Sequence, residues 1–360
     1  MTTGLSSKPT VSPGARAVEK KHTVTLIPGD GIGEEVAEQI VRLVQATGAS
    51  VGWDRQIAGT KAQARSGAAI PPAVIESIRK HKVGLKGRIS TPIGAGYESP
   101  NVQLRKQLEL YASIRPVRNI PGLPARYEGI DLVVVRENTE DMYAGIEHEV
   151  VPGVVQSLKV VTEAASLRIA RVAFEYAIEH GRKAVACVHK ANIMKQADGL
   201  FLQCCRRVAA EHPKIAYREV IADSACMQLV TNPYAFDVLV MGNLYGDIIS
   251  DLCAGLAGGL GAMPGINIGE GLVVFEAIHG NAPGLEGQDL ANPLPMLVPA
   301  VYMLRHLGEA GAADRIMKAV SEVLVEKKVL TPDLGGQARL SEMIDSIISR
   351  LPAAAIAAKA

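Results

Sequence analysis

The chain has 360 residues, 48% hydrophobic and 21% charged, so it can bury a large core and, at about 150 residues per domain, is long enough for two domains. Lys and Arg number 38 against 37 Asp and Glu, and a net charge of +1 argues against nucleic acid as a partner. No apolar run approaches the ~18 residues that span a bilayer, so we expect neither a transmembrane segment nor a membrane partner.

Segments typical of strands and helices alternate along the chain. Residues 1–21 are basic, contain two prolines and lack the apolar stretch of a secretory signal, which predicts a flexible extension, with an organellar transit peptide as the alternative. Strands are predicted at 23–27, 131–135, 184–188 and 236–241, and helices at 34–47, at 162–180 and around 316–323. This alternation predicts an α/β fold with a largely parallel sheet. Residues 351–360 are of low complexity and are expected to form a flexible tail.

The five cysteines have neither the even count of a disulfide framework nor the paired spacing of a zinc site. We therefore expect reduced thiols and a reducing compartment. A cytoplasmic location is expected, with the mitochondrial matrix as the alternative in a eukaryote.

Two glycine-rich stretches leave their roles open. Gly29 to Gly33 follow a predicted strand and open a predicted helix, but the spacing G-x-G-x-G differs from the dinucleotide-binding G-x-G-x-x-G. Either a phosphate-binding turn or a plain start of a helix fits. The stretch 254–271 contains seven glycines and fits either tight packing or a binding loop.

Two aspartates directly follow the strand at 236–241. Asp247 and Asp251 are four residues apart, so on a helix their carboxylates share one face and repel each other unless a cation lies between them. Carboxylates at the carboxyl end of a strand suit a hard divalent ion such as Mg²⁺. Asp223 is a candidate third ligand. The alternative is that these aspartates only favour the helix N-terminus.

Basic side chains interrupt apolar segments at four positions. Arg105, Arg115 and Arg136 are suited to gripping several carboxylates, and Lys190 closes a predicted strand, where a desolvated amine could act as a base. Tyr143 follows a short acidic segment. Each side chain taken singly is typical of structural residues, but together they predict a site for a multiply charged acid, a divalent metal and proton transfer.

At this point the chain resembles the isocitrate/isopropylmalate dehydrogenase family of metal-dependent decarboxylating dehydrogenases, from about His22 to Arg350. The motifs that carry the resemblance stand in the family's order: IPGDGIG, SPNVQLRKQLELYASIRP, ENTEDMYAGIEH, HKANIMK, NLYGDIISDLCAG and HGNAP followed by ANP. Within the family, the chain is most similar to the short NAD-dependent isocitrate dehydrogenases.

The resemblance implies a two-domain α/β fold that is not a Rossmann fold. Residues 22–110 and 258–350 would form a large domain on the cofactor side, and 111–257 a smaller domain with substrate, metal and dimer contacts. The active site would lie in the cleft between them, and two subunits of a homodimer or a higher homo-oligomer would share each site.

The resemblance also implies a role for each candidate residue. Arg105, Arg115 and Arg136 would grip substrate carboxylates. Asp247 and Asp251 would hold Mg²⁺ or Mn²⁺, with Asp223 reaching in from the partner subunit. Lys190, also from the partner, would help to remove the hydroxyl proton, and Tyr143 would protonate the product carbon after CO₂ leaves.

Substrate and cofactor preferences depend on two short segments. Ser99 and Asn101 offer hydrogen bonds where isopropylmalate enzymes have apolar residues, which favours isocitrate over isopropylmalate, homoisocitrate or tartrate/malate-type substrates. Gly284 stands where NAD-dependent members usually have an aspartate, so NAD is expected with weak discrimination against NADP. The implied cofactor-binding residues are Ile32, Thr91, His279, Gly280, Ala282, Pro283, Gly284, Leu285 and Asn292.

The implied activity is oxidative decarboxylation of isocitrate to 2-oxoglutarate and CO₂ with reduction of NAD. Two alternatives remain from other classes: a non-catalytic regulatory subunit that only binds ligands, and a catalytic subunit that needs a partner chain. Regulatory relatives tend to lose the catalytic set, whereas Tyr143, Lys190 and all three aspartates are present here. This favours the enzyme.

Overall fold

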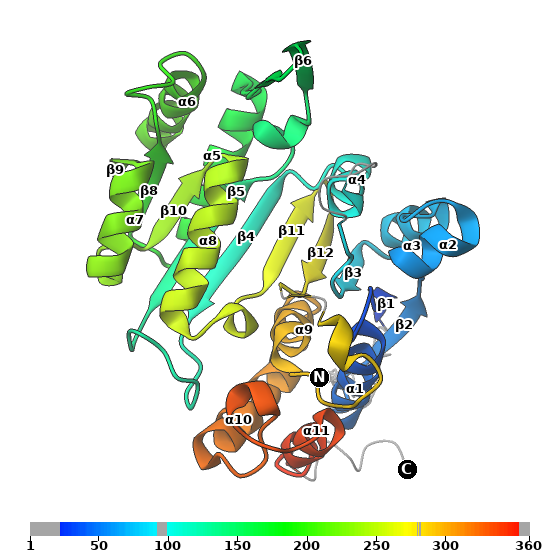
Figure 1. Ribbon diagram of the computed structural model, residues 1–360. Helices are drawn as coiled ribbons and strands as arrows, with labels where there is room; N and C mark the ends of the chain where they lie inside the picture. Colours follow the sequence, from blue (N-terminus) through cyan, green and yellow to red (C-terminus); the bar gives the residue numbers. More distant parts are fainter. Residues whose placement is uncertain (1–21, 92–98, 279, 281, 353–360) are drawn as a thin grey trace, which may run out of the picture.

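One long sheet runs through the computed structural model, which describes residues 22–91, 99–278, 280 and 282–352 (Figure 1). Ten strands of the described residues form this sheet. In spatial order they are β2 (Val51–Arg55), β1 (His22–Ile27), β3 (Val83–Lys86), β12 (Leu272–Glu276), β11 (Gly265–Gly269), β4 (Ala112–Arg118), β5 (Asp131–Glu137), β10 (Val238–Met241), β8 (Ala184–His189) and β9 (Ala216–Ile221).

The sheet is parallel except at its centre. There β4 pairs antiparallel with β5 and with β11, and β11 pairs antiparallel with β12. The prediction of an α/β fold with a largely parallel sheet is therefore confirmed. The two antiparallel strands β4 and β11 had no predicted counterpart, because Arg115 and Pro116 in β4 and the two glycines of β11 hide the apolar pattern of a strand.

Helices cover both faces of the sheet. In Figure 1, α7 and α8 lie on the near face of β5, β10 and β8, while α5 lies behind them. The helices are α1 (Gly33–Ala46), α2 (Thr60–Ser66), α3 (Pro72–His81), α4 (Pro100–Gln107), α5 (Glu163–Glu179), α6 (Ala197–Glu211), α7 (Ala222–Thr231), α8 (Asn243–Ala257), α9 (Leu294–His306), α10 (Ala310–Glu326) and α11 (Leu340–Ile348). Short 3₁₀ turns are η1 (Met142–Ala144), η2 (Pro233–Ala235), η3 (Leu260–Ala262), η4 (Pro283–Leu285) and η5 (Pro332–Leu334).

The predicted elements are present with small shifts at their ends. The helix expected at 34–47 is α1, and the one expected at 162–180 is α5 with Thr162 as its N-cap. The strand expected from 236 begins only at Val238, since the turn η2 precedes it. No helix among the described residues has the length and apolar character needed to cross a bilayer, and all five cysteines are free.

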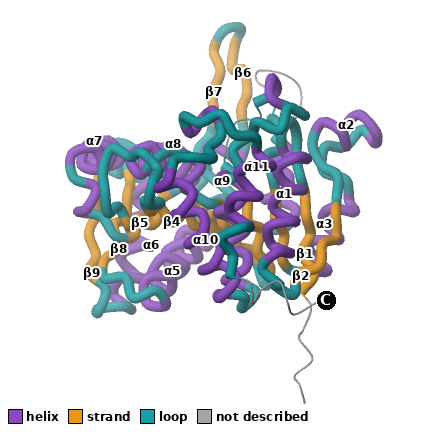
Figure 2. The backbone as a smooth tube through the Cα atoms, turned by 90° about the horizontal axis from the view of Figure 1, so that it is seen from below, coloured by secondary structure: helices purple, strands orange, loops and turns teal. Residues whose placement is uncertain are grey.

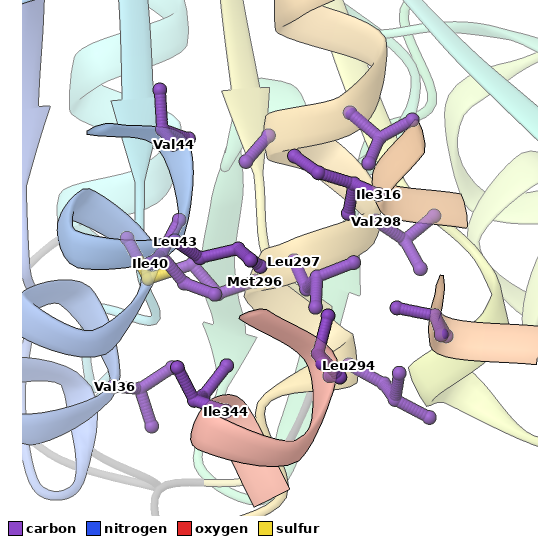
Figure 3. Close-up of a cluster of buried hydrophobic side chains, with 14 of the residues drawn as sticks. Val36, Ile40, Leu43, Val44, Leu294, Met296, Leu297, Val298, Ile316 and Ile344 are labelled. Atoms are coloured by element: carbon purple, nitrogen blue, oxygen red, sulfur yellow. The ribbon is translucent and has the colours of Figure 1, made fainter. Parts of the chain in front are cut away.

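Apolar side chains form a separate core on each face of each half of the sheet. The largest lies where α1, α9, α10 and α11 meet β1, β3 and β12, and Figure 3 shows Ile40, Leu43, Leu294, Leu297 and Ile344 packed in it. Regular spacing of Val36, Ile40, Leu43 and Val44 gives α1 the apolar stripe that it buries. The second half of the sheet has its own cores, beneath α7 and α8 on one face and beneath α5 and α6 on the other.

A hairpin stands apart from the sheet. Its strands β6 (Glu147–Val151) and β7 (Val154–Ser157) pair antiparallel only with each other, and every residue in them is exposed. Figure 2 shows the hairpin projecting from the body of the molecule. An isolated two-stranded hairpin is at best marginally stable in water.

Candidate functional site

The site is built around the first turns of α8, at the edge of the sheet where β5 and β10 end. Asp247 and Asp251 lie one turn apart on α8, as the spacing predicted. Both oxygens of Asp247 are engaged, since one accepts from the Tyr143 hydroxyl and the other from the guanidinium of Arg136. Arg115 reaches the same face, with its nitrogens 3.5 Å from Asp247 and 3.4 Å from Asp251.

Arg136 is almost fully buried at the end of β5 and is fixed by Asn243. Its Nε and one terminal nitrogen lie 2.9 and 2.7 Å from the side-chain oxygen of Asn243. Gly246 makes this fit possible, because a Cβ there would lie 2.4 Å from Cγ of Arg136. Burial, followed by repulsion from Arg115 and Arg105, lowers the pKa of Arg136 to about 10, so the side chain keeps its charge at neutral pH.

The two aspartates of α8 differ in their electrostatics. Burial raises the pKa of Asp247, but Arg136 and Arg115 outweigh it and hold that pKa below its usual value. Burial raises the pKa of Asp251 above its usual value, because the attraction of Arg115 is weaker and the charge of Asp247 repels a second charge. Arg115, which reaches both carboxylates, therefore offsets part of the predicted repulsion between them. About half of the Asp251 side chain is exposed (54%), which leaves it accessible to an added cation.

Tyr143 lies in η1, beside Arg136, whose guanidinium carbon is 5.1 Å from the centre of the tyrosine ring. Burial and the hydrogen bond to Asp247 raise the pKa of the phenol. The hydroxyl therefore keeps its proton at neutral pH, which is the state that a proton donor needs.

Lys190 and Asp223 pair with each other and not with the carboxylates of α8. The Lys190 amine donates to a carboxylate oxygen of Asp223, which lies in the first turn of α7 and whose side chain is 71% exposed. Among the described residues, no three His, Cys, Asp or Glu side chains lie close enough together to hold a metal ion. A single copy of this chain thus brings together Asp247 and Asp251 but not Asp223.

Arg105 belongs to a second buried charge cluster that the sequence analysis missed. Its guanidinium lies 3.3 Å from one oxygen of Glu276, and the amine of Lys86 lies 3.2 Å from the other. Asn101 is part of the same cluster, because its side-chain oxygen is 3.1 Å from Lys86 and its amide nitrogen is 2.9 Å from the carbonyl oxygen of Ile89. Lys86 and Glu276 each close an apolar strand, and this same signal had singled out Arg136 and Lys190.

Ser99 precedes α4 and shares a hydrogen bond of 2.8 Å with the hydroxyl of Thr91, the last described residue before the gap at 92–98.

Asn243 and Ser250 were not predicted as site residues, although both lie in the motif around Asp247. Ser250 accepts a hydrogen bond from Arg115. Neutral polar residues of this kind carry no charge that would single them out in a sequence.

The glycine-rich turn before α1 is explained by packing. A Cβ at Gly29 would lie 2.2 Å from the carbonyl oxygen of Arg88, and one at Gly33 would lie 2.2 Å from that of Pro28. The buried carboxylate of Asp30 accepts from the backbone nitrogens of Thr60 and Ser90, both at 2.8 Å. The turn therefore ties two neighbouring loops together, and Ile32, expected to contact the cofactor, is buried beside it.

The predicted cofactor residues near 279–292 form a loop with an open surface. His279 lies outside the described residues, and for Pro283 only the backbone is described. Gly284 and Leu285 are exposed in η4, next to Ala282, and, apart from the chain neighbours of Gly284, no atom of the described residues lies within 4 Å of where a Cβ on Gly284 would be. Gly280 is exposed as well. Asn292 donates to Asp333 at 2.8 Å and accepts from the nitrogen of Leu294, so its side chain caps α9.

Comparison with known proteins gives one family. The sequence profile of isocitrate/isopropylmalate dehydrogenase matches residues 23–347. The chain is 51% identical to the protein named isocitrate dehydrogenase [NAD] catalytic subunit 5, mitochondrial, of Arabidopsis thaliana, over 91% of this chain and 88% of that one. It is also 52% identical to the protein named 3-isopropylmalate dehydrogenase, chloroplastic, of Solanum tuberosum, over 85% and 86%. The crystal structure of isocitrate dehydrogenase from Methylococcus capsulatus superposes with a TM-score of 0.88 at 45% identity, over 92% of this chain and 99% of that one.

Proposed function

The chain belongs to the isocitrate/isopropylmalate dehydrogenase family, and we propose that it converts isocitrate to 2-oxoglutarate and CO₂ with reduction of NAD. The relative at 51% identity bears the name of an NAD-dependent isocitrate dehydrogenase. The observation that carries the proposal is the joining of the Tyr143 hydroxyl, the Arg136 guanidinium and the Asp247 carboxylate on the first turns of α8.

Each side chain has a proposed task in this reaction. Arg105, Arg115 and Arg136 bind the carboxylates of the substrate, because the planar fork of a guanidinium group matches a carboxylate with two parallel hydrogen bonds. Lys190 of a neighbouring subunit accepts the hydroxyl proton, and Tyr143 returns a proton to the carbon that loses CO₂. Since Lys190 and Asp223 already form a pair, they would enter a site together.

A divalent cation fits the donor set of Asp247 and Asp251. Both are carboxylates on one helical face and both are partly exposed, which suits a hard divalent ion. We propose that these two residues hold Mg²⁺ or Mn²⁺ together with Asp223 of the neighbouring subunit. When bound, the cation polarises the substrate's oxygen, and NAD accepts the hydride.

The residues of η4 leave space for the adenosine group of a cofactor, but they carry no charge that would distinguish NAD from NADP. The exposed Gly284 leaves room beside the loop, and no side chain at 284 or 285 carries a charge. We propose that Ile32, Thr91, Gly280, Ala282, Leu285 and Asn292 contribute to the cofactor site together with His279 and Pro283.

We propose that the working unit is a homodimer or a higher homo-oligomer. The hairpin β6–β7 is fully exposed and carries Val150, Val151, Val154 and Val155, each at least 49% exposed. Met227 on α7 and Ile248 on α8 add apolar surface near Asp223 and Asp247. A second copy of this chain would cover these surfaces. The alternative is that a different subunit covers them, since the relative at 51% identity is named as one subunit of its enzyme.

The strand order supports the proposed division into domains. The strands from 22–110 and 258–350 occupy one half of the sheet, and those from 111–257 the other. The two halves meet at the pairing of β4 with β11. We propose that substrate binds beside the boundary between the two halves of the sheet.

The relative at 51% identity is named as a mitochondrial protein, which favours the mitochondrial matrix over the cytoplasm as the location of this chain.

One assay tests the proposed function. The purified chain is given isocitrate and Mg²⁺ with NAD and then with NADP, and reduction of the cofactor is followed by absorbance. Isopropylmalate replaces isocitrate in a parallel series. Turnover of isocitrate with NAD supports the proposal, whereas binding of isocitrate without turnover by the chain alone supports a regulatory subunit or a subunit that needs a partner chain.

A further inference from the structure

A buried lysine outside the proposed active site joins two of its parts. Lys159 lies between β7 and α5, and its side chain is 14% exposed. Its amine lies 2.6 Å from a carboxylate oxygen of Asp198 and 3.6 Å from one of Asp141. It also lies 4.6 Å from the ring centre of Tyr245 on α8. Both carboxylates are almost fully buried, so removing the lysine would leave two buried negative charges without their counter-charge.

The first of these carboxylates holds the backbone of Lys190. The second oxygen of Asp198, in the first turn of α6, accepts from the backbone nitrogen of Lys190 at 2.6 Å. Lys190 directly follows β8, and its side chain is paired with Asp223. The direction in which the Lys190 side chain leaves the sheet therefore depends on where Asp198 is held.

The second carboxylate holds Tyr143 and α8. One oxygen of Asp141 accepts from the nitrogen of Met142 and the other from the nitrogen of Leu244, both at 2.9 Å. Met142 begins the turn η1 that carries Tyr143, and Leu244 lies in the first turn of α8 ahead of Asp247. Asp141 has φ 72° and ψ −145°, a conformation that is unfavourable for a residue with a side chain and persists only where its surroundings hold it.

We propose that Lys159 is a positioning residue that sets Lys190 and Tyr143 at the same time, through Asp198 and Asp141. The inference deepens the proposed function and rests on it for the roles of Lys190 and Tyr143. If two subunits share each site, Tyr143 serves its own subunit's site while Lys190 serves the neighbour's. One ammonium group then ties the two sites of a dimer together.

The test is the full-length Lys159→Met variant, because methionine keeps most of the length of the unbranched side chain and removes the ammonium group. A misplaced base slows the hydride step, so kcat should fall by about 10- to 100-fold with little change in KM for isocitrate. The kinetic isotope effect with isocitrate deuterated at C2 should rise, and Lys159→Arg should recover part of kcat. A loss of folded protein would lower kcat without changing the isotope effect. The exposed Lys214→Met is the matched control.

A second readout does not depend on turnover. Lysines of wild type and variant are labelled with an acylating reagent, and mass spectrometry compares Lys190 with the exposed Lys318. The labelling rate of Lys190 should change in Lys159→Met, while that of Lys318 should not. If Lys159→Met does not fold, Asp198→Asn replaces it in both measurements. Unchanged labelling of Lys190 in the folded variant overturns the inference, as does unchanged kcat and isotope effect. Absence of turnover in wild type refutes only the proposed function.

Discussion

The hydroxyl of Tyr143 donates a hydrogen bond to Asp247, so the proposed proton donor and a proposed metal ligand are in direct contact. The other oxygen of Asp247 is taken by Arg136. Each carboxylate oxygen has more than one lone pair, so a cation held by Asp247 would share these oxygens with the phenol and the guanidinium. Tyr143 and Arg136 would thus stay close to the cation, beside the place where substrate carboxylates are expected.

Tyr143→Phe should impair loss of CO₂ more than hydride transfer, because the lost proton is needed only after CO₂ leaves. The change also removes the hydrogen bond to Asp247 while keeping the ring beside Arg136. The measurement supplies the β-keto acid directly and compares its reduction with its decarboxylation. Equal loss of both half-reactions would be evidence against the assigned role.

Asp251→Asn should raise the Mg²⁺ concentration needed for half-maximal activity by at least about tenfold, since one anionic ligand is lost. Wild type treated with EDTA should lose turnover and regain it with Mg²⁺ or Mn²⁺. The exposed Asp314→Asn, which breaks only a surface pair with Arg305, is the control. Full activity of metal-free wild type would end the proposed metal role.

Much of the fold could be predicted because its parallel strands are short apolar runs and its helices carry regular apolar stripes, as β5 and α1 do. The centre of the sheet could not, because Pro116 and Arg115 interrupt β4, and its strand character comes from pairing on both sides. Tertiary contacts override local preference there.

The charged residues of the site could be predicted from the sequence, but the contacts between them could not. Asp247, Arg115 and Arg136 were predicted to belong to one site, because arginines in apolar segments and paired aspartates after a strand are unusual. Their contacts with each other and the pairing of Asn101 with Lys86 depend on segments far apart in the chain. A single sequence carries no signal of such distances. Lys86 and Glu276 each close an apolar strand and could have been noticed, but their pairing with each other and with Arg105 could not.

Ser99→Leu should weaken isocitrate binding and raise the relative kcat/KM for isopropylmalate, since an apolar wall replaces a hydroxyl that bonds only Thr91 among the contacts described. The structure separates this variant from Asn101→Leu. The latter also removes one acceptor of the buried Lys86 amine, which keeps Glu276 and the carbonyl oxygen of Gly87, and leaving one of its N–H donors unpaired costs about 1–3 kcal/mol of stability. Kinetics with both substrates and urea unfolding of both variants check this. Equal destabilisation by the two changes would contradict the described contacts.

Glu276 should make the protein lose stability in acid. Burial raises its pKa, but Lys86 and Arg105 outweigh it and hold the pKa below its usual value. A carboxyl group with a lowered pKa stabilises the fold fully above the unfolded value of about 4.3, and that contribution is lost as the pH falls below it.

Glu276→Gln should therefore be about 3–5 kcal/mol less stable at neutral pH, because Lys86 and Arg105 lose their counter-charge, and the difference should shrink on acidification. Urea unfolding from neutral pH to about pH 3 measures it. The exposed Glu322→Gln should change neither value. A constant difference between Glu276→Gln and wild type across this range would refute the electrostatic account.

Wild type should prefer NAD over NADP by a modest ratio of kcat/KM, and Gly284→Asp should raise that ratio by about tenfold, which corresponds to ~1.4 kcal/mol. The described part of the loop has room for the aspartate, since beyond the chain neighbours of Gly284 none of its atoms lies within 4 Å of a Cβ at this position. Asp289 cannot replace it, because its carboxylate accepts from the backbone nitrogen of Ser341 at 3.0 Å. The amine of Lys61, a nearby cation, is 3.8 Å from a carboxylate oxygen of Glu286, which partly neutralises its charge.

The control is Gly284→Asn, which adds hydrogen bonding without charge. If only Gly284→Asp raises the NAD/NADP ratio of kcat/KM, repulsion of the 2′-phosphate is the cause. A wild type that prefers NADP would require a basic residue such as Lys61 to reach that phosphate, and Lys61→Met would then abolish the preference.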